Sequence, residues 1–555
     1  MASPIPQGPT GYKLSLQTVA ICTFPSMAGV LFGYDSGWIA GVLAMDAFKL
    51  DFGNPNSTEK DAYRGYLYTS TAKALTTSIL SAGTFCGALA AGYVSDRIGR
   101  RSTIILGCII YTIGVVLEVI THGSIDLLAV GRTIAGLGVG FVSATTIMYV
   151  SEITPKEIRG SIMGAYQLAI TIGLLLAAVV NIGAKHLLNT GAYRIPIGIQ
   201  FAWALVLGIG MSFMPESPRW YVMKKKGENA ALALAQIHGR DPDSELIDDE
   251  YKLIADSYEE ELAAGAADSS FVDCFKGGLK RGSNLHRTMI GTSIQMFQQL
   301  TGVNFIFYYG TTFFQRAGIS NPFVVSIITA AVNVVSTPIA LWGIERLGRR
   351  KLLIFGAIGM AICEFIVAIV GTALPNSTTA QDVLITFVSL FIFCFASTWG
   401  PCAWTVCGEI YPQRTRSQST ALSTASNWFW NFIISFVTPY LVDEDKANLG
   451  PKIFFIFGAA AVGCGVWAYF VVYETSKLSL EQVDRMMNET SARRSTGWEG
   501  RDGFARKRRV DSDVEGGEKG GVRRWWSKKG RREEGGGRRE LEQIGTSSSE
   551  THQPS

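Results

Sequence analysis

Apolar runs recur along this chain, and they constrain its fold more than any other feature. We count about twelve, each roughly 20 residues long, which at about 1.5 Å per residue matches a bilayer core about 30 Å thick. The 555 residues are 48% hydrophobic and only 17% charged, a balance unsuited to a soluble multidomain protein. We therefore expect an all-α, multi-pass membrane protein embedded in a lipid bilayer. The runs cover 17–43, 67–93, 103–121, 125–150, 160–185, 195–214, 288–315, 322–344, 352–374, 383–410, 417–441 and 452–473.

Basic residues fix the expected orientation, because short loops rich in Lys and Arg stay cytoplasmic. The loops after runs 2, 4, 8 and 10 carry them, which places both chain termini in the cytoplasm. Two Asn-x-Ser/Thr acceptors, Asn56 and Asn376, then fall on the opposite side, where glycosylation occurs. The nine cysteines form no CxxC pair, so neither a metal site nor a disulfide framework is expected.

An internal repeat divides the chain into two halves. Asp96–Arg101 after run 2 recurs as Glu345–Arg350 after run 8. Repeats six spans apart, in the same order and on the same side, predict two parallel six-helix halves related by an axis along the membrane normal. We expect an N-terminal segment 1–16, a first half 17–214, a cytoplasmic linker with short helices 215–287, a second half 288–473 and a cytoplasmic tail 474–555, disordered from about 490.

The repeated charges suggest a gate. Carboxylates and guanidinium groups at the cytoplasmic helix ends can form ion pairs that hold the inner ends together while a carrier is open outward. The alternative is that these basic loops only set the topology. Carboxylates at matching positions of the two halves favour the gating network, since basic loops alone would not require them: Asp96 matches Glu345, and Glu152 matches Glu409. The candidates for this network are Asp96, Arg100, Arg101, Glu152, Arg159, Glu345, Arg349, Arg350, Glu409 and Arg416.

Four segments together resemble the sugar porter family of the major facilitator superfamily, and within it the fungal-type hexose transporters. They are Gly92–Arg101, Pro215–Arg219, Gln298–Asn304 and Trp399–Pro401, and the resemblance extends over residues 15–480. The resemblance implies a carrier of monosaccharides, and in particular of a hexose such as glucose. It implies that the carrier works by alternating access, lies in the plasma membrane and functions as a monomer. It implies no enzymatic activity, no cofactor and no nucleic-acid partner. The chain departs from the family pattern at Tyr473–Lys477 and near Ala396.

Amides in the spans suit such a solute, because Asn and Gln offer a donor and an acceptor without a net charge in a low-dielectric site. By resemblance, the sugar contacts would be Gln167, Gln298, Gln299, Asn304, Asn333 and Trp404, with Asn427, Trp428 and Asn431 as further candidates. The alternative is that these amides only join helices by hydrogen bonds.

Gln298 and Asn304 lie about 120° apart on an ideal helix, so we expect Gly302 to break that span. Tyr308 and Tyr309 follow the expected break. The sequence is equally consistent with two roles for these tyrosines, helix packing and gating of the sugar path.

Two ionisable residues lie deep in spans: Asp35 in the first and Arg132 in the fourth. Charges there are costly unless they are paired or functional. The resemblance implies that the two face each other. A carboxylate that gains and loses such a partner can take up and release a proton, which would couple sugar to protons. The alternative is a static pair that joins two helices. Glu118 and Glu364 are also intramembrane, without an assigned role.

Other functions remain open at this point. The same fold can serve as a non-transporting glucose sensor that signals through its tail, or as a facilitative carrier of pentoses or polyols. An enzyme is disfavoured, since the spans hold no HExxH, no P-loop and no Ser/His/Asp set.

Overall fold

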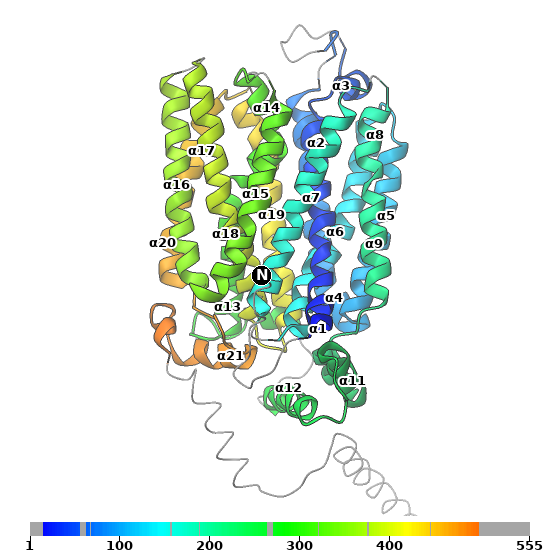
Figure 1. Cartoon of the computed structure of the whole chain (residues 1–555), viewed down its shortest axis with the longest axis vertical. Helices are drawn as coiled ribbons and strands as arrows, with labels where there is room; N and C mark the ends of the chain where they lie inside the picture. The colour runs from blue at the N-terminus through cyan, green and yellow to red at the C-terminus, as the bar shows by residue number, and fades with distance from the viewer. Residues whose placement is uncertain are drawn as a thin grey trace, which may run out of the picture.

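The computed structural model describes residues 15–55, 63–66, 68–155, 158–187, 189–263, 270–319, 321–374, 377–443 and 446–498. The candidate glycosylation sites Asn56 and Asn376 lie outside these ranges, as does the tail beyond Trp498. The named elements are α-helices and short 3-10 helices, arranged as two upright bundles side by side (Figure 1).

The N-terminal bundle holds the first six spans. The first span and the sixth are each built from consecutive shorter helices, and α3 caps the outer end. The elements are α1 Leu16–Thr23, η1 Phe24–Met27, α2 Ala28–Val42, α3 Asp46–Phe52, α4 Ser70–Ile98, α5 Arg100–Ile120, α6 Ile125–Ile153, α7 Arg159–Ala184, α8 Gly191–Gly198 and α9 Gln200–Ser212.

The C-terminal bundle repeats this plan. Its first span is split into α13 and α14, and its fourth into α17 and α18. The elements are α13 Asn284–Leu300, α14 Val303–Arg316, α15 Pro322–Arg346, α16 Arg349–Ala373, α17 Thr378–Ala396, α18 Trp399–Glu409, α19 Arg416–Val442, η3 Gly450–Lys452 and α20 Ile453–Val471.

Within the described residues, 10 helical stretches are long and apolar enough to cross a membrane. The two remaining spans of the expected twelve are α13–α14 and α19. The first is divided into pieces of 17 and 14 residues, and the 27 residues of α19 include many Ser, Thr and Asn side chains. These two spans therefore fail a simple test of length and hydropathy, and both carry candidate sugar contacts. The expected helical membrane fold is confirmed.

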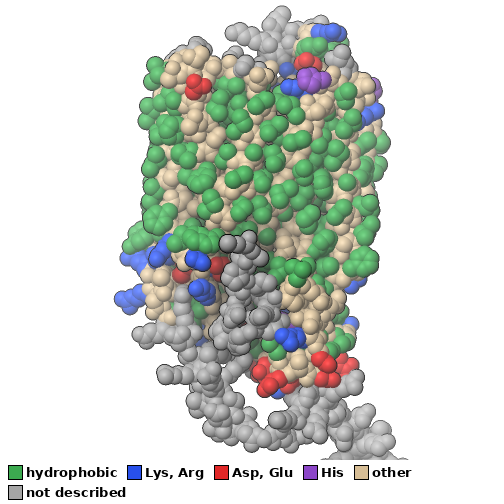
Figure 2. Space-filling view, in the orientation of Figure 1, with side chains coloured by type: hydrophobic (Ala, Val, Ile, Leu, Met, Phe, Trp, Pro, Cys, Tyr) green, Lys and Arg blue, Asp and Glu red, His purple; other side chains and the backbone are tan. Residues whose placement is uncertain are grey.

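The outer surface of the bundles is suited to lipid. Figure 2 shows a hydrophobic band between two charged ends. Val335 and Phe355 illustrate it, being 75% and 68% exposed on helices of the C-terminal bundle. Inside the bundles, small residues let helices approach closely: a Cβ on Gly136 would lie 2.2 Å from the Leu80 carbonyl oxygen. Apolar side chains therefore face outward as well as inward.

The linker and the tail cover the cytoplasmic end (Figure 1). The linker forms α10 Pro218–Met223, α11 Gly227–His238, α12 Glu245–Ala263 and η2 Phe271–Phe275, and the tail forms α21 Leu480–Glu489 and η4 Ala492–Gly497. The described tail thus continues past residue 490, near which we expected disorder to begin. Trp498 Nε1 donates to Glu489 Oε2 at 2.9 Å.

Candidate functional site

Gly302 breaks the seventh span, as the sequence predicted. Its φ of +77° is left-handed, and it separates α13 from α14. A Cβ at this position would lie 2.4 Å from the Phe457 ring, so both the backbone angle and the packing favour glycine. Across the break, Asn304 donates to Gln299, while Gln298 and Gln299 accept from Asn427 and Asn431 of α19.

The first amide group joins α13, α18 and α19. Gln298 Nε2 donates to the Gly400 and Trp399 carbonyl oxygens at 2.9 and 3.2 Å. Asn427 Nδ2 donates to Gln298 Oε1 at 2.8 Å and to Gln295 Oε1 at 2.6 Å. Gln295 was not among the sequence candidates, although it lies one turn before Gln298.

The second amide group reaches the opposite bundle. Asn431 Nδ2 donates to Gln299 Oε1 at 3.2 Å, and Asn304 donates to the same oxygen. Tyr308 lies at 3.1–3.2 Å from the Asn431 amide. Ser81 of α4 donates to Asn431 Oδ1 at 2.7 Å. This last bond crosses from the N-terminal half to the C-terminal half.

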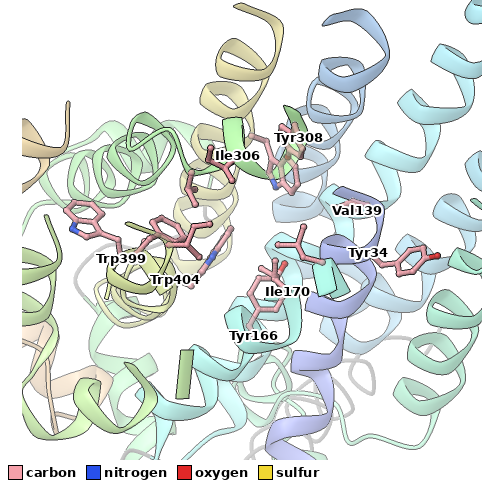
Figure 3. Packing of buried hydrophobic residues seen from close by; sticks show 14 of the residues in the cluster. Tyr34, Val139, Tyr166, Ile170, Ile306, Tyr308, Trp399 and Trp404 are labelled. Carbon is pink, nitrogen blue, oxygen red and sulfur yellow. The ribbon is translucent and has the colours of Figure 1, made fainter. Parts of the chain in front are cut away.

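Aromatic side chains complete the contact between the halves. Trp404 Nε1 donates to Gln167 Oε1 at 3.2 Å, and the Trp404 ring meets Tyr166 edge to face at 5.4 Å. Figure 3 shows Trp404 and Tyr166 close together, one from each bundle. Trp428 meets Phe32 of the first span at 4.7 Å. Tyr309, by contrast, donates to the Ser435 carbonyl oxygen of its own half.

Several buried polar atoms of the candidate site have no hydrogen-bond partner among the described residues. They include both amide atoms of Asn333, Asn427 Oδ1, Trp428 Nε1 and the Tyr166 hydroxyl. Asn333 and Trp428 are 0% exposed. Since burying a polar group without a partner is costly, these atoms are candidates for hydrogen bonds to a solute with hydroxyl groups.

A small hollow lies between the bundles. Its cavity volume is about 30 Å³, and it is lined by residues of α2, α7, α14 and α15. Thr329 and Ala330 line it and lie one helical turn from Asn333. The hollow therefore lies between the two halves, and Asn333 itself is not among the residues that line it.

Asp35 and Arg132 face each other inside the N-terminal half, as the resemblance implied. Arg132 Nη1 lies 3.4 Å from Asp35 Oδ1, and both side chains are fully buried. Trp38 Nε1 donates to the same carboxylate oxygen at 3.0 Å, and the Arg132 guanidinium stacks over the Trp38 ring at 4.9 Å.

The repeated charges form matching ion pairs at the inner ends. Arg100 bonds Glu152 through Nε and Nη2, at 3.0 and 3.2 Å. Arg349 bonds Glu409 in the same way, at 3.2 and 2.7 Å. Each pair is buried within its own half. Each therefore fixes three helix ends of one half rather than bridging the halves.

Glu216 and Glu474 belong to the same arrangement. Both lie in segments compared with the family pattern above, but neither was among the candidate gating residues. Glu216 accepts from the Arg100 and Arg101 backbone N–H groups at 2.9 and 3.1 Å. Glu474 accepts from the corresponding groups of Arg349 and Arg350 at 3.1 and 3.2 Å. Each carboxylate follows the last span of its half, so the internal repeat carried a signal that could have found them.

Bonds between the halves at the inner end come from Asp96 and Glu345. Asp96 accepts from Ser417 Oγ at 2.6 Å and from Gln418 Nε2 at 2.7 Å. Glu345 accepts from the Ser161 backbone N–H at 3.1 Å. These two carboxylates also lie near Arg100 and Arg349, which links the ion pairs to the interface.

Four arginines expected in the ion-pair network donate to backbone carbonyl oxygens. Arg101 bonds Met214 and Arg350 bonds Tyr469, at 3.1 and 2.6 Å. Arg159 and Arg416 reach back to carbonyl oxygens of the preceding turns, Thr154 and Tyr411. Helix C-termini leave such oxygens without helical partners, which a guanidinium satisfies without a carboxylate.

Asp443 closes the outer end, which the sequence reading did not foresee. Its carboxylate lies 2.6 Å from Arg316 Nη1 and accepts from Ser70 Oγ at 2.5 Å. Lys73 Nζ is 3.9 Å away. Ser70 and Lys73 begin α4 of the N-terminal half, so polar contacts join the two halves at both ends.

Comparison with known proteins decides the family. Residues 21–487 match the family described as "Sugar (and other) transporter". The chain belongs to the sugar porter family of the major facilitator superfamily. It is 43% identical to the major facilitator-type transporter ecdD of Aspergillus rugulosus, over 90% of this chain and 92% of that protein. It is also 43% identical to the probable glucose transporter rco-3 of Neurospora crassa, covering 85% and 79%.

Other relatives and a solved structure agree. The high glucose sensor RGT2 of Saccharomyces cerevisiae is 39% identical over 87% of this chain and 62% of the sensor. The proton:xylose symporter XylE bound to 6-bromo-6-deoxy-D-glucose aligns with a TM-score of 0.73 at 26% identity, covering 85% of this chain and 99% of that one. The chain is thus a multi-pass sugar transporter of this family and not an enzyme.

Proposed function

We propose that this transporter carries a hexose, glucose above all, by alternating access around the amide groups at the interface between its halves. The observation that carries the proposal is the bond from Trp404 to Gln167 across that interface. It is joined by the Asn333 amide, which has no hydrogen-bond partner among the described residues and lies on α15, a helix that packs against α7. Alternating access requires a site whose contacts come from both halves, so that solute binding and rocking are linked.

The hydrogen bonds among the Asn and Gln side chains support the proposal, because a bound sugar could replace them. Gln298, Gln299, Asn427 and Asn431 use each other as partners here. Hydroxyl groups of a hexose both donate and accept, so they can replace these bonds one for one. A carboxylate solute fits less well, because the nearby fixed cation, Arg132, is paired with Asp35.

The proposal includes proton coupling through Asp35 and Arg132, at the plasma membrane, by a single chain. The named relatives include a probable glucose transporter, and the aligned XylE is a proton:xylose symporter. The 3.4 Å contact between Asp35 and Arg132 is long for an ion pair, and Asp35 Oδ2 has no partner among the described residues. A carboxylate held this loosely by its cation can exchange a proton during the cycle.

Sugar uptake in cells that lack their own hexose transporters tests the substrate. We expect saturable uptake of labelled glucose, inhibited by other hexoses more strongly than by xylose or mannitol. A protonophore should abolish accumulation above equilibrium. Stronger competition by a pentose or a polyol would replace the hexose assignment, and uptake that ignores the protonophore would remove the proton coupling.

A glucose sensor is the second candidate, favoured by the 39% identity to RGT2. A sensor binds glucose without moving it. Two results would together favour this function over transport. Glucose would bind the purified protein and stabilise it against heat, and the same preparation would show no glucose flux.

A further inference from the structure

Glu118 lies beside the Asp35–Arg132 pair, and no role has been assigned to it above. It is on α5, 1% exposed, and its Cγ would lie 3.0 Å from a Cβ placed on Gly131, the neighbour of Arg132. Gln200 Nε2 donates to Glu118 Oε2 at 3.3 Å, and Tyr111 donates in turn to Gln200. Glu118 therefore packs directly against the turn that carries Arg132.

One cation thus faces two carboxyl groups. Arg132 contacts Asp35, while its charge and that of Asp35 both act on Glu118. Asp35 Oδ2, Glu118 Oε1 and Arg132 Nε have no hydrogen-bond partner within the described ranges. The hydrogen-bonding capacity of the three side chains is therefore not fully used. Arg132 keeps one donor, Nε, in addition to the group that contacts Asp35.

Among the described residues, the other titratable groups that interact with this cluster are tyrosines, which are neutral at physiological pH. They are Tyr34 on α2, Tyr68 before α4, Tyr111 on α5 and Tyr308 on α14. With both carboxyl groups ionised, the cluster would carry a net negative charge in the low-dielectric interior, which is strongly unfavourable. One bound proton makes it neutral.

We propose that Asp35, Glu118 and Arg132 together hold one shared proton, and that Arg132 pairs with whichever carboxylate has released it. The pairing of Arg132 with Asp35 seen here corresponds to the state in which Glu118 carries the proton. Moving Arg132 to Glu118 would transfer the proton to Asp35, with no change in net charge. The shared proton stands without the proposed function, whereas its use in coupling rests on that proposal.

Infrared spectroscopy of the full-length protein in proteoliposomes tests the shared proton through the carbonyl band of protonated carboxyl groups. Wild type should show this band at neutral pH. Both Glu118→Gln and Asp35→Asn should remove the same component, because either change leaves a single carboxylate paired with Arg132. Glu364→Gln is the matched control. Glu364 is equally buried, on α16 in the other half, and its removal should leave that component unchanged.

Two infrared results would overturn the proposal. One is an unchanged band in Glu118→Gln. The other is a component that disappears in Glu118→Gln but persists in Asp35→Asn, which would assign the proton to Glu118 alone.

Transport measurements separate this inference from the proposed function. If wild type accumulates sugar under an inward proton gradient, Glu118→Gln should lose that accumulation and the pH dependence of exchange, while Glu364→Gln keeps both. Retention of both in Glu118→Gln would contradict a role for the shared proton in coupling. If wild type does not accumulate sugar, the coupling proposed above fails, and the infrared result still decides whether the proton is shared.

Discussion

Trp404 of the C-terminal half donates a hydrogen bond to Gln167 of the N-terminal half, with 3.2 Å between Nε1 and Oε1. The bond joins α18, which follows a break in its span, to α7, an uninterrupted helix of 26 residues. The bond therefore joins the two halves directly, and a movement of one half relative to the other must break or rearrange it.

Gln167→Ala should weaken sugar binding more than it weakens the fold. A hydrogen bond contributes about 1 kcal/mol, and more when a buried partner is left unpaired, so we expect KM to rise about tenfold. Uptake of labelled glucose over a range of concentrations measures this. Gln236→Ala, at an exposed position on α11, is the control and should behave as wild type. An unchanged KM in Gln167→Ala would remove this residue from the site.

Gly99→Ala should disturb the inner end of the first half. Gly99 has a φ of +93°, and a Cβ there would lie 2.3 Å from Glu216 Oε2. The strain and the displaced carboxylate should cost about 2 kcal/mol. The melting temperature of the purified protein measures the loss. Gly348→Ala offers an internal comparison, since Gly348 meets Glu474 in the same way, and the two variants should lose similar stability.

Glu481→Gln should destabilise the protein at neutral pH and much less in acid. Burial opposes the charge of Glu481, but Arg219 at 2.8 Å prevails and lowers the pKa of Glu481 to about 2, from its ordinary value of 4.5. A lowered pKa in the folded state stabilises that state above pH 4.5, by on the order of 3 kcal/mol, and the stabilisation is lost as pH falls toward 2.

Melting temperatures of wild type and Glu481→Gln, compared from pH 7 downward, check the sign of this effect. The difference between the two should be constant above about pH 5 and should shrink below the ordinary pKa. The exposed pair of Arg485 and Glu489 provides the control, and Arg485→Gln should change the melting temperature little at any pH. A difference that grew in acid would contradict the account.

A disulfide across the outer end should stop transport reversibly. Ser70 Oγ and Asp443 Oδ2 are 2.5 Å apart and belong to opposite halves. Cysteines at both positions should crosslink under oxidation, hold the outer end closed and abolish uptake, and reduction should restore it. Each single cysteine variant controls for the loss of the native side chain. Full uptake by the crosslinked protein would show that this end need not open.

The helices and their halves could be predicted because hydropathy and an internal repeat are properties of the chain itself. The break at Gly302 was predictable for a similar reason, since Gln298 and Asn304 could not share one face of a regular helix. The contact between Asp35 and Arg132 required the resemblance to a family. Sequence alone does not indicate which two helices lie side by side.

The remaining contacts depend on distances between helices that no local pattern encodes. Arg101 and Arg350 bond carbonyl oxygens at the ends of neighbouring helices, and every residue presents the same oxygen. Asp443 lay in a loop with no recurring partner, so its role at the outer end had no sequence signal. The amides bond one another in this structure, and their direct contact with sugar stays a prediction.

Counterflow of labelled glucose in proteoliposomes of the purified protein tests the central claim most directly. Wild type should exchange external labelled glucose for internal unlabelled glucose. Gln298→Ala should lose this exchange, because Gln298 bonds both Asn427 and the start of α18. We predict exchange in wild type and its loss in Gln298→Ala at equal protein stability. Exchange that persists undiminished in Gln298→Ala, or that is absent from a folded wild type, would contradict it.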